Sequence, residues 1–153
     1  MAAFGTWNFF DGALESRSSG HHFSETKALS DELVRRGKTV RLYCYRDPPA
    51  GRFPGAETIP TFSVSPYISL SNDPVWSAME NFIVHNRVFD RDLQRLDAAS
   101  FHNGLAVFPT IDLWQLMGLL RWLGRFDASV RPKAAVNLFP MRDRKSTRLN
   151  SSH

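Results

Sequence analysis

A continuous apolar run, Gly104-Leu105-Ala106-Val107-Phe108-Pro109, has the length of a β-strand. A strand inside a parallel sheet is covered by helices on both faces, so it is apolar throughout and does not alternate. The run therefore predicts a central parallel strand. The segment after it, from Leu113 to Leu123, is dense in Leu and Trp and predicts a helix packed on the sheet. Gln115 and Arg121 are expected on the solvent side of that helix.

Strand and helix patterns also alternate along the rest of the chain. Strands are expected at residues 3–10, 39–45, 58–64 and 134–140, a helix at 21–36, and one or two helices within 74–96. Gly37 stands where a left-handed residue ends many helices. Strands that alternate with helices predict an α/β fold, here a Rossmann-like parallel sheet with helices on both faces.

The C-terminal segment 143–153 is similar to the translation of a sequencing-adapter read, and its eleven residues fit one reading frame. We therefore expect one Rossmann-like domain over residues 1–142 and an artefactual, disordered tail at 143–153. The natural protein would then continue beyond about Arg142. The competing interpretation is a natural polar and basic C-terminus.

The charge of the chain gives little support to nucleic-acid binding. The chain has 19 Lys and Arg and 15 Asp and Glu, a formal net charge of +4; without residues 143–153, 16 basic and 14 acidic residues give +2. The single cysteine, Cys44, lies in an apolar strand and is expected to be a buried small hydrophobe in a reducing compartment. No run approaches the roughly 20 apolar residues that span a bilayer. We expect a cytoplasmic protein without a nucleic-acid partner, and a membrane partner is not indicated.

The best candidate binding site is the loop that precedes the helix at 21–36. Parallel sheets bind ligands beyond the C-terminal ends of their strands, and this loop follows the first strand. Its small residues Ser19 and Gly20 would let the backbone approach a ligand, and His21 and His22 add hydrogen-bonding groups at a helix N-terminus. In the competing interpretation Ser19 caps the helix while both histidines face solvent.

Thr110 and Asp112 follow the central strand, so they are expected at the same edge of the sheet. Either residue could contact a ligand or cap the next helix, and capping is the more common role. The charged segments 85–87 and 90–92 predict a solvated helix face. No catalytic grouping emerges. No metal is expected because adjacent His21 and His22 would point apart, without Cys or carboxylate partners at ligand spacing. No other cofactor is indicated.

Several short motifs occur in an order that resembles the GT-B glycosyltransferases. They are Ala13 to His22, Ala28-Leu29, Glu32-Leu33, Arg35 to Arg41, Val107 to Thr110, Gln115-Leu116, Gly118-Leu119 and Arg121 to Leu123. The resemblance implies an incomplete N-terminal domain of a bacterial enzyme of this family, a domain that mainly binds the acceptor. By position, Ser19 to His22 would face the cleft between two domains, with Thr110 opposite. The short aromatic first strand departs from the family pattern, which puts the start codon in doubt.

The resemblance also implies a reaction and its partners. A second Rossmann-like domain would hold the nucleotide-sugar, and the sugar would pass to an unknown acceptor without an essential metal. Residues 1–142 alone would then be inactive. One alternative is a stand-alone flavodoxin-like module that binds a ligand or regulates without catalysis. Another is an epimerase or a dehydrogenase, and the absence of a G-x-G-x-x-G fingerprint counts against both.

Overall fold

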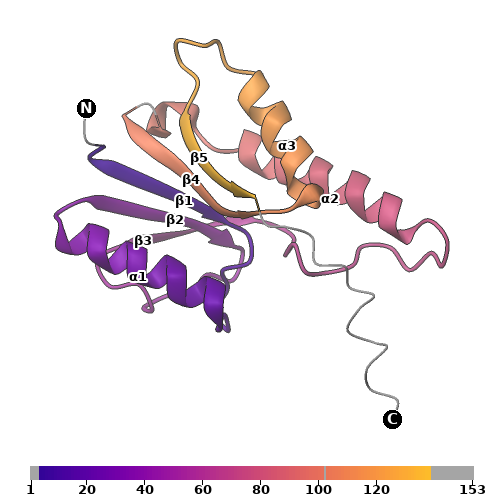
Figure 1. The fold of residues 1–153 in the computed structure, drawn as a ribbon, viewed down its shortest axis with the longest axis horizontal. Helices are drawn as coiled ribbons and strands as arrows, with labels where there is room; N and C mark the ends of the chain where they lie inside the picture. The colour runs from indigo at the N-terminus through magenta and orange to yellow at the C-terminus, as the bar shows by residue number, and fades with distance from the viewer. Residues whose placement is uncertain (1–3, 102, 139–153) are drawn as a thin grey trace.

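The computed structural model describes residues 4–101 and 103–138, which form one parallel sheet with helices on both faces (Figure 1). The elements are β1 (Thr6–Asp11), α1 (His21–Arg35), β2 (Thr39–Tyr45), β3 (Glu57–Phe62), α2 (Ser77–Gln94), a 3-10 turn (Ala98–Phe101), β4 (Gly104–Ile111), α3 (Leu113–Gly124) and β5 (Lys133–Leu138). The strand order is β3-β2-β1-β4-β5. The predicted α/β fold is confirmed. The tail expected at 143–153, and the end of the last expected strand at Phe139 and Pro140, lie outside the described residues.

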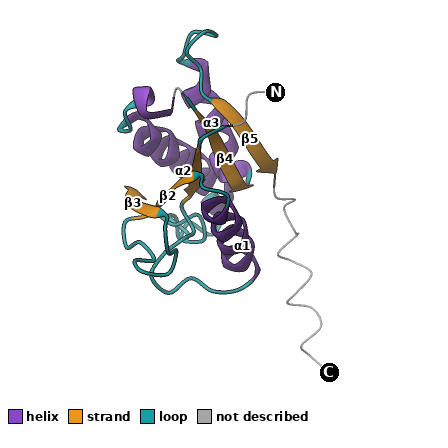
Figure 2. Ribbon diagram, turned by 90° about the vertical axis from the view of Figure 1, so that its left-hand side faces the viewer, coloured by secondary structure: helices purple, strands orange, loops and turns teal. Residues whose placement is uncertain are grey.

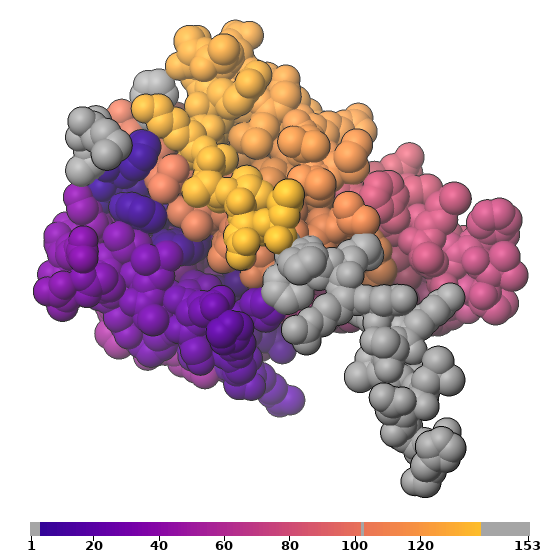
Figure 3. All heavy atoms as spheres, in the orientation of Figure 1, coloured from indigo at the N-terminus to yellow at the C-terminus, as the bar shows by residue number. Residues whose placement is uncertain are grey.

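The predicted central strand is β4, which pairs in parallel with β1 on one side and β5 on the other. The middle position of the sheet belongs to β1. β5 is one of the two edge strands, and all six of its residues are exposed. Its atoms lie uncovered on the surface in Figure 3.

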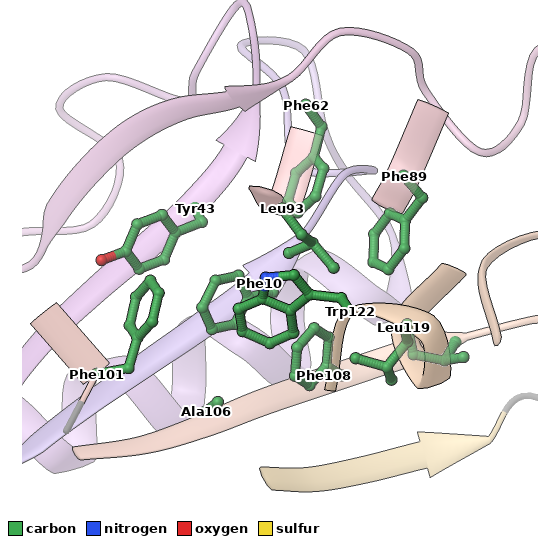
Figure 4. Close-up of a cluster of buried hydrophobic side chains, with 11 residues drawn as sticks. Phe10, Tyr43, Phe62, Phe89, Leu93, Phe101, Ala106, Phe108, Leu119 and Trp122 are labelled. Atoms are coloured by element: carbon green, nitrogen blue, oxygen red, sulfur yellow. The ribbon is translucent and has the colours of Figure 1, made fainter. Parts of the chain in front are cut away.

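Two apolar cores lie on opposite faces of the sheet because consecutive side chains of β1 point in opposite directions. Phe9 packs with Leu33 of α1 on one face. Phe10 points to the face covered by α2 and α3, where its ring stacks between Tyr43 at 4.6 Å and Phe108 at 4.8 Å (Figure 4). The adjacent phenylalanines of β1 thus join both helical layers to one strand.

Helix α1 ends as the sequence predicts. Gly37 has a φ of 72°, in the left-handed region that glycine adopts without steric strain. The amides of Gly37 and Lys38 donate to the carbonyls of Val34 and Leu33, at 2.9 Å each. The pattern satisfies two carbonyls of the last turn and turns the chain directly into β2.

Helix α2 is a single helix, and the solvated face predicted for residues 85–87 and 90–92 is wrong for four of its members. His85, Asn86, Asp90 and Asp92 are at most 7% exposed. They are buried because specific partners satisfy them. The Asn86 amide nitrogen, for example, donates to the Leu113 carbonyl at 3.0 Å, and its oxygen accepts from the Gly118 amide at 2.9 Å.

Helix α3 is rotated about its axis relative to the sequence prediction. Arg121 is exposed as expected, but Gln115 is only 5% exposed, so its predicted solvent position is wrong. The rotation follows from Gly118, where a Cβ would lie 2.5 Å from the Asn86 carbonyl oxygen. The missing side chain lets the two helix backbones approach closely, and this contact turns Leu113 and Met117 outward.

Candidate functional site

The strand order changes direction at β1, which marks the expected ligand crevice. The chain runs from β1 through α1 to β2 on one side, while β4 lies on the other side (Figure 1). Figure 2 shows α1, β2 and β4 from a second direction. A parallel α/β sheet binds ligands at such a point, beyond the C-terminal ends of the strands. Phe9 of β1 pairs with Val107 of β4, so Asp11 and Pro109 stand at the same level two residues further on. Thr110 comes next and is half-buried at this edge.

The loop after β1 is held in place by its own side chains. The Ser18 hydroxyl donates to the Ala13 carbonyl at 2.9 Å and accepts from the Glu15 amide at 2.7 Å. Two bonds within six residues close the loop on itself. The sequence identified this stretch only as small and polar, without this internal bonding.

The segment between β2 and β3, distant in sequence, holds the same loop in place through Asp47 and Arg52. The Arg52 guanidinium donates to the carbonyls of Ser16 at 3.1 Å and Ser18 at 2.6 Å, and lies 4.0 Å above the Phe23 ring. The Ser16 hydroxyl donates to the Asp47 carboxylate at 2.5 Å. These contacts fix the position of the first turn of α1 relative to the sheet.

The N-terminus of helix α1 shows that the interpretation of Ser19 as its cap is wrong. Gly20 is the N-cap residue, its φ is 86°, and no side chain caps the helix. Only glycine adopts this backbone conformation readily. A Cβ at Gly20 would meet nothing within 4 Å, and Ser19 is exposed. The backbone at this predicted site is therefore open to solvent.

The two histidines of the predicted site lie in different surroundings. The His21 side chain is 81% exposed and contacts Glu25 at 2.8 Å, the i to i+4 position. His21 therefore faces solvent, as the competing interpretation expects. His22 is half-buried and acts electrostatically on Asp11. Of the pair, His22 is the residue that lies near Asp11.

Asp11 is a site residue that the sequence interpretation missed. It ends β1 and is 4% exposed; its Oδ1 accepts from the Ala13 amide at 2.9 Å, while its Oδ2 is buried without a hydrogen bond to the described residues. Burial raises the pKa of Asp11, and the Ala13 amide and the charge of His22 act in the opposite direction. An Asp-Gly pair is typical of a turn, so the sequence alone does not indicate that this carboxylate is buried.

The remaining polar candidates have structural roles. Asp112 caps α3, because its carboxylate accepts from the Trp114 amide at 2.9 Å. Thr110 lies inside β4 and does not cap the helix. Cys44 is fully buried, and burial raises its pKa to about 12, as its interpretation as a small hydrophobe requires.

Within residues 4–101 and 103–138, no three His, Cys, Asp or Glu side chains gather in a way that could hold a metal ion. Over the same ranges, no helix has both the length and the apolar character needed to cross a membrane.

Comparison with known proteins gives no relative: no family model matches the chain, and no curated protein or solved structure is significantly similar to it.

Proposed function

We propose that this chain forms the acceptor side of a GT-B glycosyltransferase, which transfers a sugar from a nucleotide-sugar to an acceptor hydroxyl. The observation that best supports the proposal is the position of His22. It lies at the glycine-capped start of α1, within electrostatic range of buried Asp11, where the strand order changes direction. Ser19 and Gly20 leave the backbone beside it accessible.

This arrangement suits proton transfer from an acceptor hydroxyl. In the proposed reaction, the His22 imidazole takes the hydroxyl proton as the acceptor oxygen bonds to the anomeric carbon. The bond from that carbon to the phosphate breaks, and a nucleoside diphosphate leaves. The Asp11 carboxylate stabilises the imidazolium that forms, because a nearby negative charge favours a protonated histidine. A second α/β domain would hold the nucleotide-sugar.

The strand order bears on the alternative functions. A flavodoxin-like sheet has the order 2-1-3-4-5, whereas this sheet has the order β3-β2-β1-β4-β5. The connection from β1 to α1 lacks the glycine fingerprint of epimerases and dehydrogenases that bind dinucleotides. A binding module without catalysis is the second candidate, and it predicts ligand binding in this crevice without turnover.

The test is an activity assay on the complete polypeptide encoded by the parent gene. It measures nucleoside diphosphate release from UDP-sugars and GDP-sugars, with and without a panel of hydroxyl acceptors. We expect His22→Ala to lower kcat by about 100-fold or more. His21→Ala is the matched control, because that side chain faces solvent, and it should change kcat by less than about 2-fold.

Three outcomes would contradict the proposal. The first is that no donor releases a nucleotide. The second is that His22→Ala has the same kcat as the unmodified protein. The third is turnover by residues 1–142 alone, which would remove the need for a second domain. A reading frame that stops just after codon 142 would favour the binding module.

A further inference from the structure

Helices α2 and α3 lie on the same face of the sheet, and their outer side carries large apolar side chains (Figure 1). A surface helix normally places polar and charged groups on its solvent side. Here polar groups such as Asn81 and Gln115 are buried, while apolar groups point outward. Eight of these, between 39 and 74% exposed, form a surface that we call the outer apolar face. They are Val75, Trp76, Met79, Ile83, Val84, Leu113, Met117 and Leu120.

The outer apolar face continues from one helix to the other because the two helices are in direct contact. The Asn86 amide nitrogen donates to the Leu113 carbonyl at 3.0 Å, so the first turn of α3 lies beside the middle of α2. Ile83 precedes Asn86 by one helical turn, and Met79 precedes Ile83 by another, so both lie on the side of α2 that adjoins this contact. Met117 follows Leu113 by one turn and extends the surface along α3.

The area of the outer apolar face is that of a protein interface. A large side chain presents up to about 150–250 Å², so eight side chains that are about half exposed present roughly 800 Å². The largest apolar patch of a typical monomer is about 300–600 Å², whereas a stable interface buries about 800 Å² on each partner. A surface of this size therefore indicates a protein partner.

The charges on the outer side of α2 favour a second copy of the chain as that partner. Glu80 in the first turn and Arg87 two turns later are both exposed, and Arg87 makes no salt bridge with the described residues. A twofold axis that crosses α2 between Ile83 and Val84 would place Glu80 of each copy opposite Arg87 of the other, because the two residues are equally far from that axis. A parallel pair of helices would instead place like charges together, so the charges select the antiparallel arrangement.

The same twofold axis also matches other side chains of α2. Ile83 of one copy would meet Val84 of the other at the centre of the interface. Trp76 and Arg91 are likewise equally far from the axis, and both are exposed. The Arg91 guanidinium of one copy would therefore lie near the Trp76 ring of the other, an arrangement that a cation and an indole ring favour. The outer side of α2 is thus complementary to itself in both shape of pattern and charge.

We infer that this chain forms a symmetric dimer through the outer apolar face, with α2 of one copy antiparallel to α2 of the other. In this arrangement α3 of one copy faces α3 of the other, so Leu113 and Met117 are covered as well. The inference is independent of the proposed function. Helix α1, which bears His22, packs on the opposite face of the sheet, so the dimer leaves His22 uncovered.

The test is sedimentation equilibrium of the chain at concentrations of about 1–100 μM, because even weak interfaces of this area have micromolar dissociation constants. We expect twice the chain mass of 17.4 kDa. Glu80→Arg should raise the dissociation constant by about 10-fold or more, since two ion pairs of the symmetric dimer become two repulsive pairs. Arg87→Glu should have the same effect. The double variant Glu80→Arg/Arg87→Glu restores both pairs and should bring the constant to within about 3-fold of that of the unmodified chain.

Glu25→Arg is the matched control, because it reverses an exposed acidic residue on α1 and should leave the dissociation constant unchanged. Ile83→Glu is a second variant that tests the centre of the interface without the ion pairs. It brings two carboxylates together at the twofold axis and should abolish the dimer. Circular dichroism shows whether each variant keeps the helical content of the unmodified chain.

A monomeric mass at every concentration overturns the inference. So does a dimer that neither single charge reversal weakens, or that the double variant does not restore, because its copies would then meet through another surface. Vesicles of phosphatidylglycerol and phosphatidylcholine distinguish a lipid surface from a second copy. A chain that stays monomeric in solution and cosediments with the vesicles would show that the outer apolar face binds lipid, which also overturns the dimer.

Discussion

Replacing Gly118 by alanine tests the contact between α2 and α3, because two effects of the change oppose each other. Helix propensity alone predicts that alanine stabilises the interior of α3 by about 1 kcal/mol relative to glycine. Packing predicts the reverse, since the new Cβ would lie 2.5 Å from the Asn86 carbonyl oxygen and 3.2 Å from the Asp90 amide nitrogen. The sign of the measured change decides which effect dominates.

The magnitude follows from how far the helices must move. Ordinary contact begins near 3.4 Å, so the two backbones must separate by about 0.9 Å to accept the methyl group. Both atoms belong to the backbone of α2 and cannot rotate away. Overpacking costs about 1–3 kcal/mol, and the upper end applies here, which leaves a net loss of about 2 kcal/mol after the propensity gain. For a chain of this size the loss lowers Tm by about 4–8 °C.

The assay is urea unfolding followed by tryptophan fluorescence, to which Trp122, 2% exposed, contributes. The control is Gly124→Ala at the end of α3, where a Cβ would meet nothing within 4 Å. The control should be neutral or slightly more stable than the parent. A Gly118→Ala protein at least as stable as the parent would refute the close contact of the two helices.

Three further predictions concern titratable groups. Cys44 should react with a thiol reagent at pH 8 only as fast as the chain unfolds, because the thiol is buried and its pKa is raised to about 12; fast reaction in the native state would contradict this. Burial raises the pKa of Asp11, so its contribution to stability is complete below about pH 3.9 and is lost as the pH rises. Asp11→Asn should therefore raise the urea midpoint at pH 7 and leave it nearly unchanged near pH 3. The Arg125 guanidinium lowers the pKa of Asp90, so Asp90→Asn should lose on the order of 1 kcal/mol in urea unfolding at pH 7, and the loss should shrink as the pH falls below about 3.9.

The fold was largely predictable because its strands and helices have strong local signals. The run from Gly104 to Pro109 and the β-branched and aromatic residues of β2 identify their strands without tertiary information. Gly37 likewise identifies the end of α1. The polar face of α2 was predicted wrongly because burial of Asn86 and Asp90 depends on partners from another helix, Gly118 and Arg125. A periodicity argument has no access to those contacts.

The candidate site was predictable only in part, for a similar reason. The small residues at Ser19 and Gly20 indicated a loop, and Gly20 indeed starts α1. The different roles of His21 and His22 depend on which of the two faces Asp11, and the side-chain pattern of a loop does not determine that.

The contacts of Arg52 and Asp47 with the loop between β1 and α1 affect how this loop could be engineered. Residues 13–20 owe part of their shape to a guanidinium and a carboxylate that lie more than 25 positions away in sequence, at Arg52 and Asp47. The loop therefore does not keep its full conformation independently of the rest of the fold. A graft of residues 13–20 onto another sheet would carry the sequence and lose the conformation, unless residues 46–53 were transferred with it in the same relative position.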